Sequence, residues 1–306
     1  MNVRQLHYFL QVAELRSFTR AAAILHIAQP ALSRSVRALE DELGVTLFHR
    51  SERGVTLTES GELLKRRAAD LLADFTKVRD EVAAGATTLR GELSFGMPPS
   101  MQEMVTLPLI EAFRAAHPLV LLRFTEGISV TLNEGLQAGK IDVAIVAANE
   151  PLAAPHQTPL VTEGMFLVGP TNARLSLRRP VSLERVASEP LIVTLRPNSL
   201  RALLETALTR AGQRFEPVME ANATALMIAA VARGGGYTVL PYCAIGRALR
   251  EKRVSAAPVA NLRVMWALAY AQNRTKSRAV AELSRLAQAV AEHTVGANTW
   301  KSAEMA

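Results

Sequence analysis

Residues 21–50, AAAILHIAQPALSRSVRALEDELGVTLFHR, decide the fold of the first part of the chain. The run of alanines at the start has no bulk, so a neighbouring helix can approach it closely. Residues 26–30 break the helical pattern, and Pro30 is well tolerated in the first turn of a new helix. In that new helix one apolar stripe at helical spacing consists of Leu32, Val36, Leu39 and Leu43. The stretch therefore predicts two helices joined by a tight turn.

The face of the new helix that lies about 100–200° from the apolar stripe is polar. It carries Pro30, Ser33, Arg34 and Arg37, with Gln29 at its start. Arginine can bind guanine through two hydrogen bonds, and serine or glutamine can reach base edges or phosphates. Residues 16–37 contain four arginines and no acidic residue, which is typical of a phosphate-facing surface. The face indicates DNA recognition; the alternative is a small helical subdomain with a solvated basic face.

The flanking segments complete a DNA-binding domain. An earlier helix is predicted from the helical spacing of Leu6, Phe9, Leu10 and Ala13, and Ser17 is a suitable N-cap for the helix that contains the alanines. Residues 45–48 and 55–58 are β-prone runs around a polar turn that carries Arg50 and Arg53. These two arginines are well placed to contact phosphates or the minor groove. We expect residues 1–57 to form a helix-turn-helix with a two-stranded wing.

Residues 6–61 resemble the winged helix-turn-helix of LysR-type transcriptional regulators. The pattern AAAxLHxAQPALSRxVRxLExxLGxxLFxR is dense and specific to that family. The resemblance implies that the recognition helix presents Gln29, Pro30, Ser33, Arg34 and Arg37 to DNA. It also implies a regulator of promoter DNA that assembles as a dimer of dimers, with RNA polymerase as a further partner.

Residues 58–90 are predicted to contain a linker helix that Thr58 caps and that ends near residue 84. Its apolar residues alternate at spacings of four and three: Leu64, Ala68, Leu71, Phe75, Val78 and Val82. A helix of about 26 residues is roughly 40 Å long, which is more than its own small domain can cover. The seam therefore predicts a homodimer, and the alternative is a helix that lies on the second part of its own chain.

From residue 91 onward the pattern alternates between strands and helices. Strands at 92–96, 120–125 and 142–147 are separated by helices at 100–116 and 129–138, an order that predicts a parallel sheet. A second set of strands and helices follows up to residue 240, and then come a strand at 264–271 and a helix at 277–293. Two α/β lobes joined by two crossings resemble periplasmic binding proteins and the LysR-type effector domain. We expect lobe I at 91–162 and 265–295, lobe II at 163–264, and a disordered tail at 296–306.

Candidate effector residues follow the predicted strands, because ligands of open parallel sheets lie beyond the carboxyl ends of the strands. Ser100 and Ser129 fall at two such junctions and Ser199 at a third. Their hydroxyls can bind a carboxylate or sulfonate at a helix N-terminus, or merely cap their own helices. The further candidates around the same rim are Met101, Gln102, Ile128, Ala147, Met165, Arg196, Asn222 and Tyr237. Arg196 would be a counter-ion for an acid, or else a solvated loop residue.

Composition narrows the classes of function. The 306 residues, 49% hydrophobic and 21% charged, suffice for more than one domain, and the net charge of +7 favours an anionic partner. One cysteine and six scattered histidines give no disulfide framework and no metal-ligand spacing. No apolar run spans a bilayer and the start does not read as a signal peptide, so we expect a soluble, cytoplasmic protein.

These observations predict a LysR-type regulator and not an enzyme. The chain would bind promoter DNA as a homo-oligomer and respond to a small anionic effector between two lobes, without a cofactor. A solute-binding protein of a transport system is the first alternative, but it would leave the first 90 residues unexplained. An enzyme on the α/β lobes is the second, and the sequence supplies neither a nucleophile–base pair nor a metal set.

Overall fold

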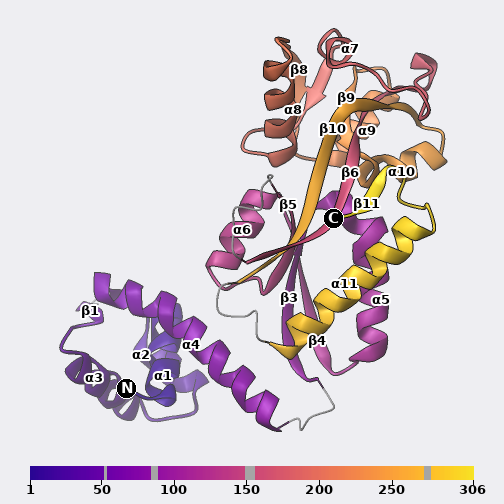
Figure 1. Ribbon diagram of the computed structural model, residues 1–306. Coiled ribbons are helices and arrows are strands. Elements are labelled where there is room, and N and C mark those ends of the chain that lie inside the picture. The colour runs from indigo at the N-terminus through magenta and orange to yellow at the C-terminus, as the bar shows by residue number, and fades with distance from the viewer. Residues whose placement is uncertain (52–53, 84–88, 149–155, 272–276) are drawn as a thin grey trace. The chain divides into compact units, whose positions relative to one another are not determined.

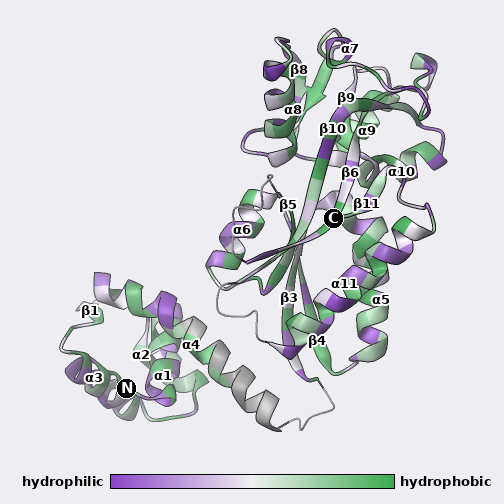
Figure 2. Ribbon diagram, viewed as in Figure 1, coloured by the Kyte–Doolittle hydropathy of each residue, from purple (hydrophilic) through white to green (hydrophobic). Residues whose placement is uncertain are grey.

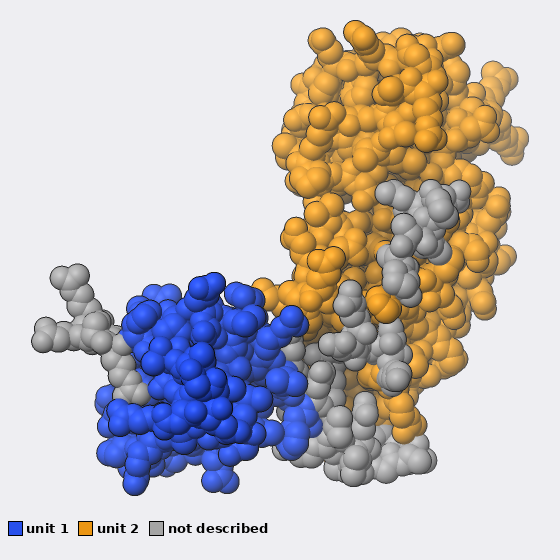
Figure 3. All heavy atoms as spheres, turned by 60° about the vertical axis from the view of Figure 1, so that its left-hand side comes forward, with its two compact units in different colours: residues 1–88 blue, residues 89–306 orange. Residues whose placement is uncertain are grey.

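The computed structural model describes residues 1–51, 54–83, 89–148, 156–271 and 277–306. The chain divides into two compact units, residues 1–88 and residues 89–306 (Figure 3). Among the described helices, none is both long and apolar enough to cross a membrane. Each unit has a hydrophobic core of its own.

The first unit contains the predicted helix-turn-helix and wing. Its elements are α1 (Val3–Leu15), α2 (Phe18–Ile24), α3 (Gln29–Leu43), β1 (Phe48–Ser51) and β2 (Gly54–Leu57). The α3 stripe is confirmed at three positions, because Leu32, Val36 and Leu39 are fully buried. It is wrong at Leu43, which is 39% exposed because the helix ends there and Gly44 turns the chain away with φ of +68°.

The linker helix α4 (Glu59–Ala83) begins where the sequence predicts, and the Thr58 hydroxyl accepts a hydrogen bond from the Gly61 N–H at 3.0 Å. Its first turns pack on the core of its own unit, where Ala68 is fully buried and Leu64 is half-buried. Further along, Leu71 is 49% and Phe75 is 52% exposed. The side chains of Val78 and Val82 lie outside the described residues.

The second unit is built on one mixed sheet with the strand order β11-β6-β10-β5-β3-β4, and β9 pairs with β6. Its strands are β3 (Gly91–Met97), β4 (Val120–Glu126), β5 (Val143–Ala148), β6 (Gln157–Pro170), β9 (Thr238–Pro241), β10 (Val254–Tyr270) and β11 (Ala303–Met305). The predicted parallel pairing of β3 with β4 and β5 is confirmed. In lobe I, α5 (Leu107–Ala116) and α11 (Arg278–Gly296) cover one face of the sheet and α6 (Ser129–Gln137) covers the other (Figure 1).

Lobe II contains the remaining helices and a small parallel sheet. Its elements are α7 (Leu183–Ala187), β7 (Leu191–Val193), α8 (Ser199–Arg210), β8 (Pro217–Glu220), α9 (Thr224–Ala232) and α10 (Tyr242–Arg250). The long strands β6 and β10 pair antiparallel and run through both lobes (Figure 1). They are the two crossings, and β10 returns to lobe I by pairing with β5, as the resemblance implies. Figure 2 shows that the inner strand β5, with the sequence VAIVAA, is hydrophobic along its length.

Of two further expectations about the second unit, one is confirmed in its bounds but not in its helix type, and the other is wrong. The helix predicted at 100–116 begins as a 3₁₀ turn (Pro99–Met101) and a π-helical turn (Gln102–Thr106) before α5. Pro108 has no N–H to donate to the Met104 carbonyl, so the regular α-helical hydrogen bond at this position is missing. The tail is ordered, because α11 reaches Gly296, β11 joins the sheet and Trp300 is 1% exposed.

Candidate DNA-binding and effector sites

The recognition helix α3 leaves its N-terminus open. The N-cap residue Ala28 has no side chain that can cap, Pro30 occupies the first turn, and that turn has no acidic residue. Pro30 has no N–H, and the Ala31 N–H donates to the Ala28 carbonyl at 2.9 Å. What this end of the helix offers an anion is therefore the positive end of the helix dipole.

The predicted DNA-binding side chains of α3 lie on its outer surface. Gln29, Pro30, Arg34 and Arg37 are exposed and Ser33 is half-buried. Arg34 makes one long contact, from Nε to the Pro30 carbonyl at 3.4 Å. Within the described parts of the chain, neither Arg34 nor Arg37 forms an ion pair, so both charges are available to phosphates.

The wing is attached to α3 by a residue that sequence reasoning missed. One oxygen of the Glu40 carboxylate accepts the N–H groups of Leu47 at 2.7 Å and Phe48 at 3.2 Å. The Phe48 ring then packs on the ring of Phe9 at 5.2 Å between centroids. Arg50 lies on β1 opposite Val55, but its side chain and all of Arg53 lie outside the described residues.

The second unit contains two adjoining pockets between its lobes. The inner pocket is lined from lobe I by predicted residues Ser100, Ile128, Ser129 and Ala147, and from lobe II by Ser199 and Asn222. Its described walls contain no charged side chain. Sequence reasoning missed Thr194, Thr224, Leu240 and Trp266, which also line it. The two threonines could have been found by the rule that located the serines, namely that ligand-binding residues follow the carboxyl ends of strands. No sequence pattern indicates that a tryptophan inside a strand faces a pocket.

The outer pocket continues from the inner one, and both are lined by Pro99, Ser100, Asn222, Thr224 and Ala244. Its volume is about 470 Å³, compared with about 50 Å³ for the inner pocket. The predicted residue Gln102 lines the outer pocket, together with four charged side chains: Glu103, Glu126, Arg247 and Arg253. The cleft is therefore neutral inside and charged at its mouth.

Two helices from opposite lobes point uncapped N-termini at the inner pocket. The N-cap residues of α6 and α9 are Ile128 and Ala223, which form no side-chain cap. Ser129 does not cap its helix, because its hydroxyl accepts the Ala147 N–H at 2.9 Å. The hydroxyls of Ser199 and Thr224 have no hydrogen-bond partner among the residues that the structure describes. The walls thus offer free N–H and O–H donors to a bound molecule.

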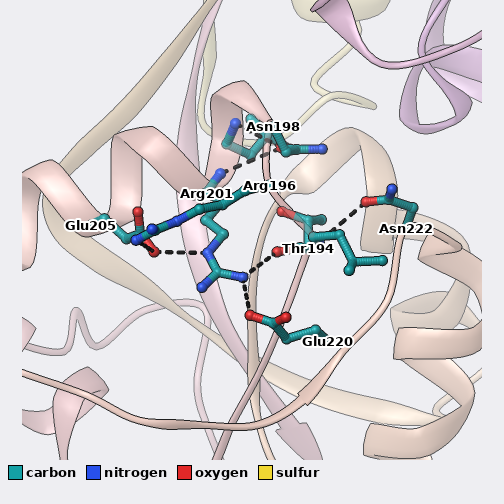
Figure 4. Close-up of polar contacts among 9 residues, drawn as sticks. Thr194, Arg196, Asn198, Arg201, Glu205, Glu220 and Asn222 are labelled. Atoms are coloured by element: carbon teal, nitrogen blue, oxygen red, sulfur yellow. Dashed lines mark hydrogen bonds and ion pairs between the residues drawn. The ribbon is translucent and has the colours of Figure 1, made fainter.

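A network of ion pairs holds the lobe II wall in place (Figure 4). Arg201, only 8% exposed, donates from Nε to Glu205 at 2.7 Å and from Nη1 to the Thr194 carbonyl at 2.8 Å, and it also pairs with Glu220. Burial raises the pKa of Glu205, but the hydrogen bonds from Arg196 and Arg201 outweigh it and hold that pKa below its ordinary value. Arg201 therefore fixes the turn that carries Thr194 and Ser199.

Four predicted effector residues line neither pocket. Met101 and Met165 are fully buried in the core. The Tyr237 ring lies against Gly169, where an added Cβ would come within 2.5 Å of it. Arg196 is 71% exposed and pairs with Glu205 at 2.8 Å, so its charge is already neutralised within the protein. Strand ends identify which segments approach the cleft, but not which side chains face it.

Comparison with known proteins identifies both units. The family model described as bacterial regulatory helix-turn-helix protein, lysR family, matches residues 3–62. The model of the LysR substrate binding domain matches residues 86–292.

Several characterised regulators are similar over most of the chain. The nitrogen assimilation regulatory protein nac of Klebsiella aerogenes is 35% identical over 242 residues, which cover 79% of this chain and 78% of the relative. A hydrogen peroxide-inducible genes activator of Pectobacterium carotovorum is 30% identical over 247 residues, covering 81% of this chain and 82% of the relative.

Solved structures agree in fold. Full-length OxyR of Pseudomonas aeruginosa superposes with a TM-score of 0.70 at 24% identity, covering 94% of this chain and 95% of that one. Full-length CbnR in complex with its target DNA gives 0.65 at 22% identity, covering 95% of this chain and 100% of that one. With its helix-turn-helix unit and its two-lobed α/β unit, the chain belongs to the LysR family of DNA-binding transcriptional regulators that carry an effector-binding domain.

Proposed function

We propose that this regulator binds promoter DNA as a homo-oligomer and that its inner pocket binds a small organic anion. In the DNA-binding unit, α3 enters the major groove with Gln29, Pro30, Ser33, Arg34 and Arg37 toward the bases and phosphates. Arg50 and Arg53 of the wing contact the adjacent backbone or minor groove. The support for this placement is the N-terminus of α3, which has neither a side-chain cap nor an acidic residue in its first turn, and the exposed arginines of the helix.

The homo-oligomer forms through the linker helix α4. Leu71 and Phe75 are about half exposed, although both belong to an apolar seam. A second copy of the same seam is the simplest cover for it, and Leu64, Val78 and Val82 extend the seam along the helix. Two recognition helices then read two half-sites of an approximately dyad-symmetric operator. A dimer of dimers places four such helices on one promoter, where they control the access of RNA polymerase.

The class of effector follows from the inner pocket. The observation that carries the proposal is that uncapped N-termini of α6 and α9 meet there from opposite lobes. Helix N-termini attract negative charge, and the free hydroxyls beside them add hydrogen-bond donors. Ile128, Leu240 and Trp266 supply apolar wall for the rest of the molecule. A compact organic carboxylate or sulfonate fits this combination of donors and apolar surface.

The effector acts by shifting the equilibrium between an open and a closed arrangement of the two lobes. The lobes are connected by β6 and β10, and the pocket is built from both lobes. An anion that bridges α6 and α9 binds the closed arrangement more tightly than the open one, which is the condition for any shift. The shift changes the spacing of the DNA-binding units and hence the bending of the promoter.

A direct response to peroxide, suggested by the name of the Pectobacterium relative, has less support. The chain contains one cysteine, Cys243, and it is buried. Burial and the neighbouring Glu163 raise the pKa of Cys243 well above its ordinary value. The reactive species in thiol oxidation is the thiolate, so this site disfavours it.

The effector proposal is tested by thermal unfolding of the full chain with sodium acetate, benzoate or sulfate, each against sodium chloride at equal ionic strength. At least one of the three anions should raise the unfolding midpoint, because binding to the native state alone stabilises it. Benzamide, the uncharged counterpart of benzoate, should not. Ser199→Ala should at least halve the shift, whereas Ser188→Ala, outside both pockets, should preserve it. An anion site would be contradicted if benzoate and benzamide gave equal, non-zero shifts, or if none of the three anions gave a shift that Ser199→Ala reduces, since sulfate also stabilises proteins by its exclusion from their surface.

A further inference from the structure

A carboxylate lies buried between the lobes, behind the walls of the two pockets. Glu163, in the middle of β6, is fully buried. One of its oxygens accepts the indole N–H of Trp266 at 2.6 Å. The other accepts the indole N–H of Trp300 at 2.8 Å and the backbone N–H of Cys243 at 3.1 Å. Burial raises the pKa of Glu163, and these hydrogen bonds oppose that effect. A buried carboxylate needs such donors, so its partners are held to it strongly.

The three donors come from three separate parts of the second unit. Trp266 belongs to β10, the other crossing strand, and Cys243 lies in the first turn of α10 in lobe II. Trp300 belongs to the C-terminal segment, defined here as residues 297–306. Glu163 therefore joins both crossing strands, lobe II and the end of the chain at one point.

Two of these donors also reach the effector cleft. Trp266 lines the inner pocket and Cys243 lines the outer pocket. Ser100 and Glu163 are both near enough to the Cys243 thiol to change its pKa, Ser100 lowering it and Glu163 raising it, and Ser100 lines both pockets. Glu163 and Trp300 line neither pocket. Hydrogen bonds to one carboxylate therefore connect Trp266 and Cys243, in the walls of the cleft, with Trp300 outside it.

The C-terminal segment is fixed to β6 at the same position. Ala303 of β11 pairs with Glu163 itself, and the Gly164 N–H donates to the Ser302 carbonyl at 3.0 Å. A side chain at Gly164 would collide with the Ser302 hydroxyl, at 2.5 Å from the added Cβ. This close approach lets Trp300 reach inward to the carboxylate. The family model for the effector domain ends at residue 292, before this segment.

We propose that Glu163 is a positioning residue of the effector cleft, and that it couples effector binding to the C-terminal segment through Trp300. The inference rests on the proposed anion site in the inner pocket. An anion held beside Trp266 and Ser100 changes their hydrogen bonds, Glu163 readjusts, and the Trp300 indole follows. If the carboxylate were purely structural, it would hold Trp300 in place, and Trp300 would not respond when an anion fills the pocket.

The chain contains two tryptophans, and both donate to Glu163. Full-length protein labelled with 5-fluorotryptophan thus gives two ¹⁹F resonances, which Trp266→Phe and Trp300→Phe assign. The probe is sodium acetate, titrated against sodium chloride at equal ionic strength. Both resonances should shift in the wild type with the same midpoint. In Glu163→Gln the Trp266 response should persist, while the Trp300 response should fall at least fivefold.

Matched variants separate the possible failures. Glu304→Gln, on β11 with its exposed side chain bonded to Arg263, should behave like the wild type. If Trp266 responds in the wild type and Trp300 does not, or if Trp300 responds equally in Glu163→Gln, the coupling is wrong. If neither resonance responds to acetate, sodium benzoate and sodium sulfate are titrated in the same way. If neither resonance responds to any of the three, the anion site fails, and the coupling that rests on it fails with it.

A further variant covers the case in which Glu163→Gln does not fold. Trp300→Phe keeps most of the ring and removes the N–H that anchors Glu163. The acetate midpoint read at Trp266 should weaken at least threefold in Trp300→Phe and stay unchanged in Glu304→Gln. An unchanged midpoint in Trp300→Phe would overturn the positioning role.

Discussion

Helices α3 and α8 both begin beside a binding surface and both carry arginines, yet they use them in opposite ways. The α3 N-terminus has no side-chain cap, and its Arg34 and Arg37 are exposed. The α8 N-terminus is capped by Asn198, which accepts the N–H groups of Leu200 and Arg201. Arg201 is buried and neutralised by Glu205 and Glu220.

The difference reflects what each helix binds. A polyanion such as DNA is held by charges and N–H groups that the protein leaves unsatisfied. A pocket for a small molecule needs walls that stay in place, so α8 uses its charges internally to fix the turn at residues 194–199 (Figure 4). Substitutions of the exposed α3 arginines should therefore change binding with little effect on stability, whereas substitution of the buried Arg201 in α8 should mainly lower stability.

The largest effect is expected for Arg201→Met in α8. The substitution leaves Glu205 and the Thr194 carbonyl without their buried donor, so the effector unit should lose about 3 kcal/mol of unfolding free energy. Chemical denaturation of the full chain measures this loss. Arg196→Met is the matched control, because Arg196 shares Glu205 but is 71% exposed and should cost less than about 1 kcal/mol. Equal losses for the two variants would contradict an internal role for Arg201.

Next in size is Arg34→Ala in α3. Operator affinity should weaken by about 1–3 kcal/mol without a change in the unfolding midpoint. Arg210→Ala removes the same charge from an exposed position in the second unit and should leave operator affinity nearly unchanged. Anisotropy on labelled DNA at moderate salt compares the two. Unchanged affinity in Arg34→Ala would show that α3 is not the recognition helix.

A smaller effect is expected for Glu40→Ala, where α3 uses one of its own charges internally. The Leu47 and Phe48 N–H groups would lose their acceptor, at a cost of about 1–2 kcal/mol to the first unit. Glu42→Ala, on the same helix with a 53% exposed side chain, should cost much less. Thermal unfolding compares them, and a neutral Glu40→Ala would mean that the wing is held without this carboxylate.

The smallest effect is the pH dependence of the α8 network. Because the pKa of Glu205 is lowered in the folded protein, its contribution is complete above the ordinary value of 4.5 and is lost as pH falls through the folded value. Between pH 6 and pH 3.5 the wild type should lose more unfolding free energy than Glu205→Gln, because only the wild type has this carboxylate to protonate. If the unfolding free energies of the two proteins changed with pH in parallel, the Glu205 carboxylate would contribute nothing to the network.

The contrast between α3 and α8 also explains which parts of the two sites could be predicted from the sequence. The DNA-binding face lies on one helix, so helical spacing alone brings Ser33, Arg34 and Arg37 together. The α8 network joins Arg201 to Glu220 across 19 positions, and no local pattern indicates that pairing. Strand ends located Ser100, Ser129 and Ser199 correctly at the inner pocket, but the same rule placed Met101 and Met165 there, and they are in the core.

The C-terminal tail shows the limit of composition as a guide. Its short polar stretch has no periodicity, which predicted disorder, yet Trp300 anchors it to a carboxylate 137 positions earlier in the chain. The indole N–H satisfies Glu163 at the same time as the ring is buried, and both gains depend on tertiary structure. Neither partner could be inferred from the residues around it.

The most direct test is the anisotropy of the full chain on DNA from immediately upstream of its own gene, with unrelated DNA of equal length, at two salt concentrations. A face that combines phosphate contacts with base contacts predicts weaker binding at higher salt but a preserved preference for the upstream DNA. If the protein bound both DNAs with equal affinity, and if salt abolished both interactions to the same extent, base recognition by α3 would be contradicted. The α3 arginines would then only attract polyanions in general.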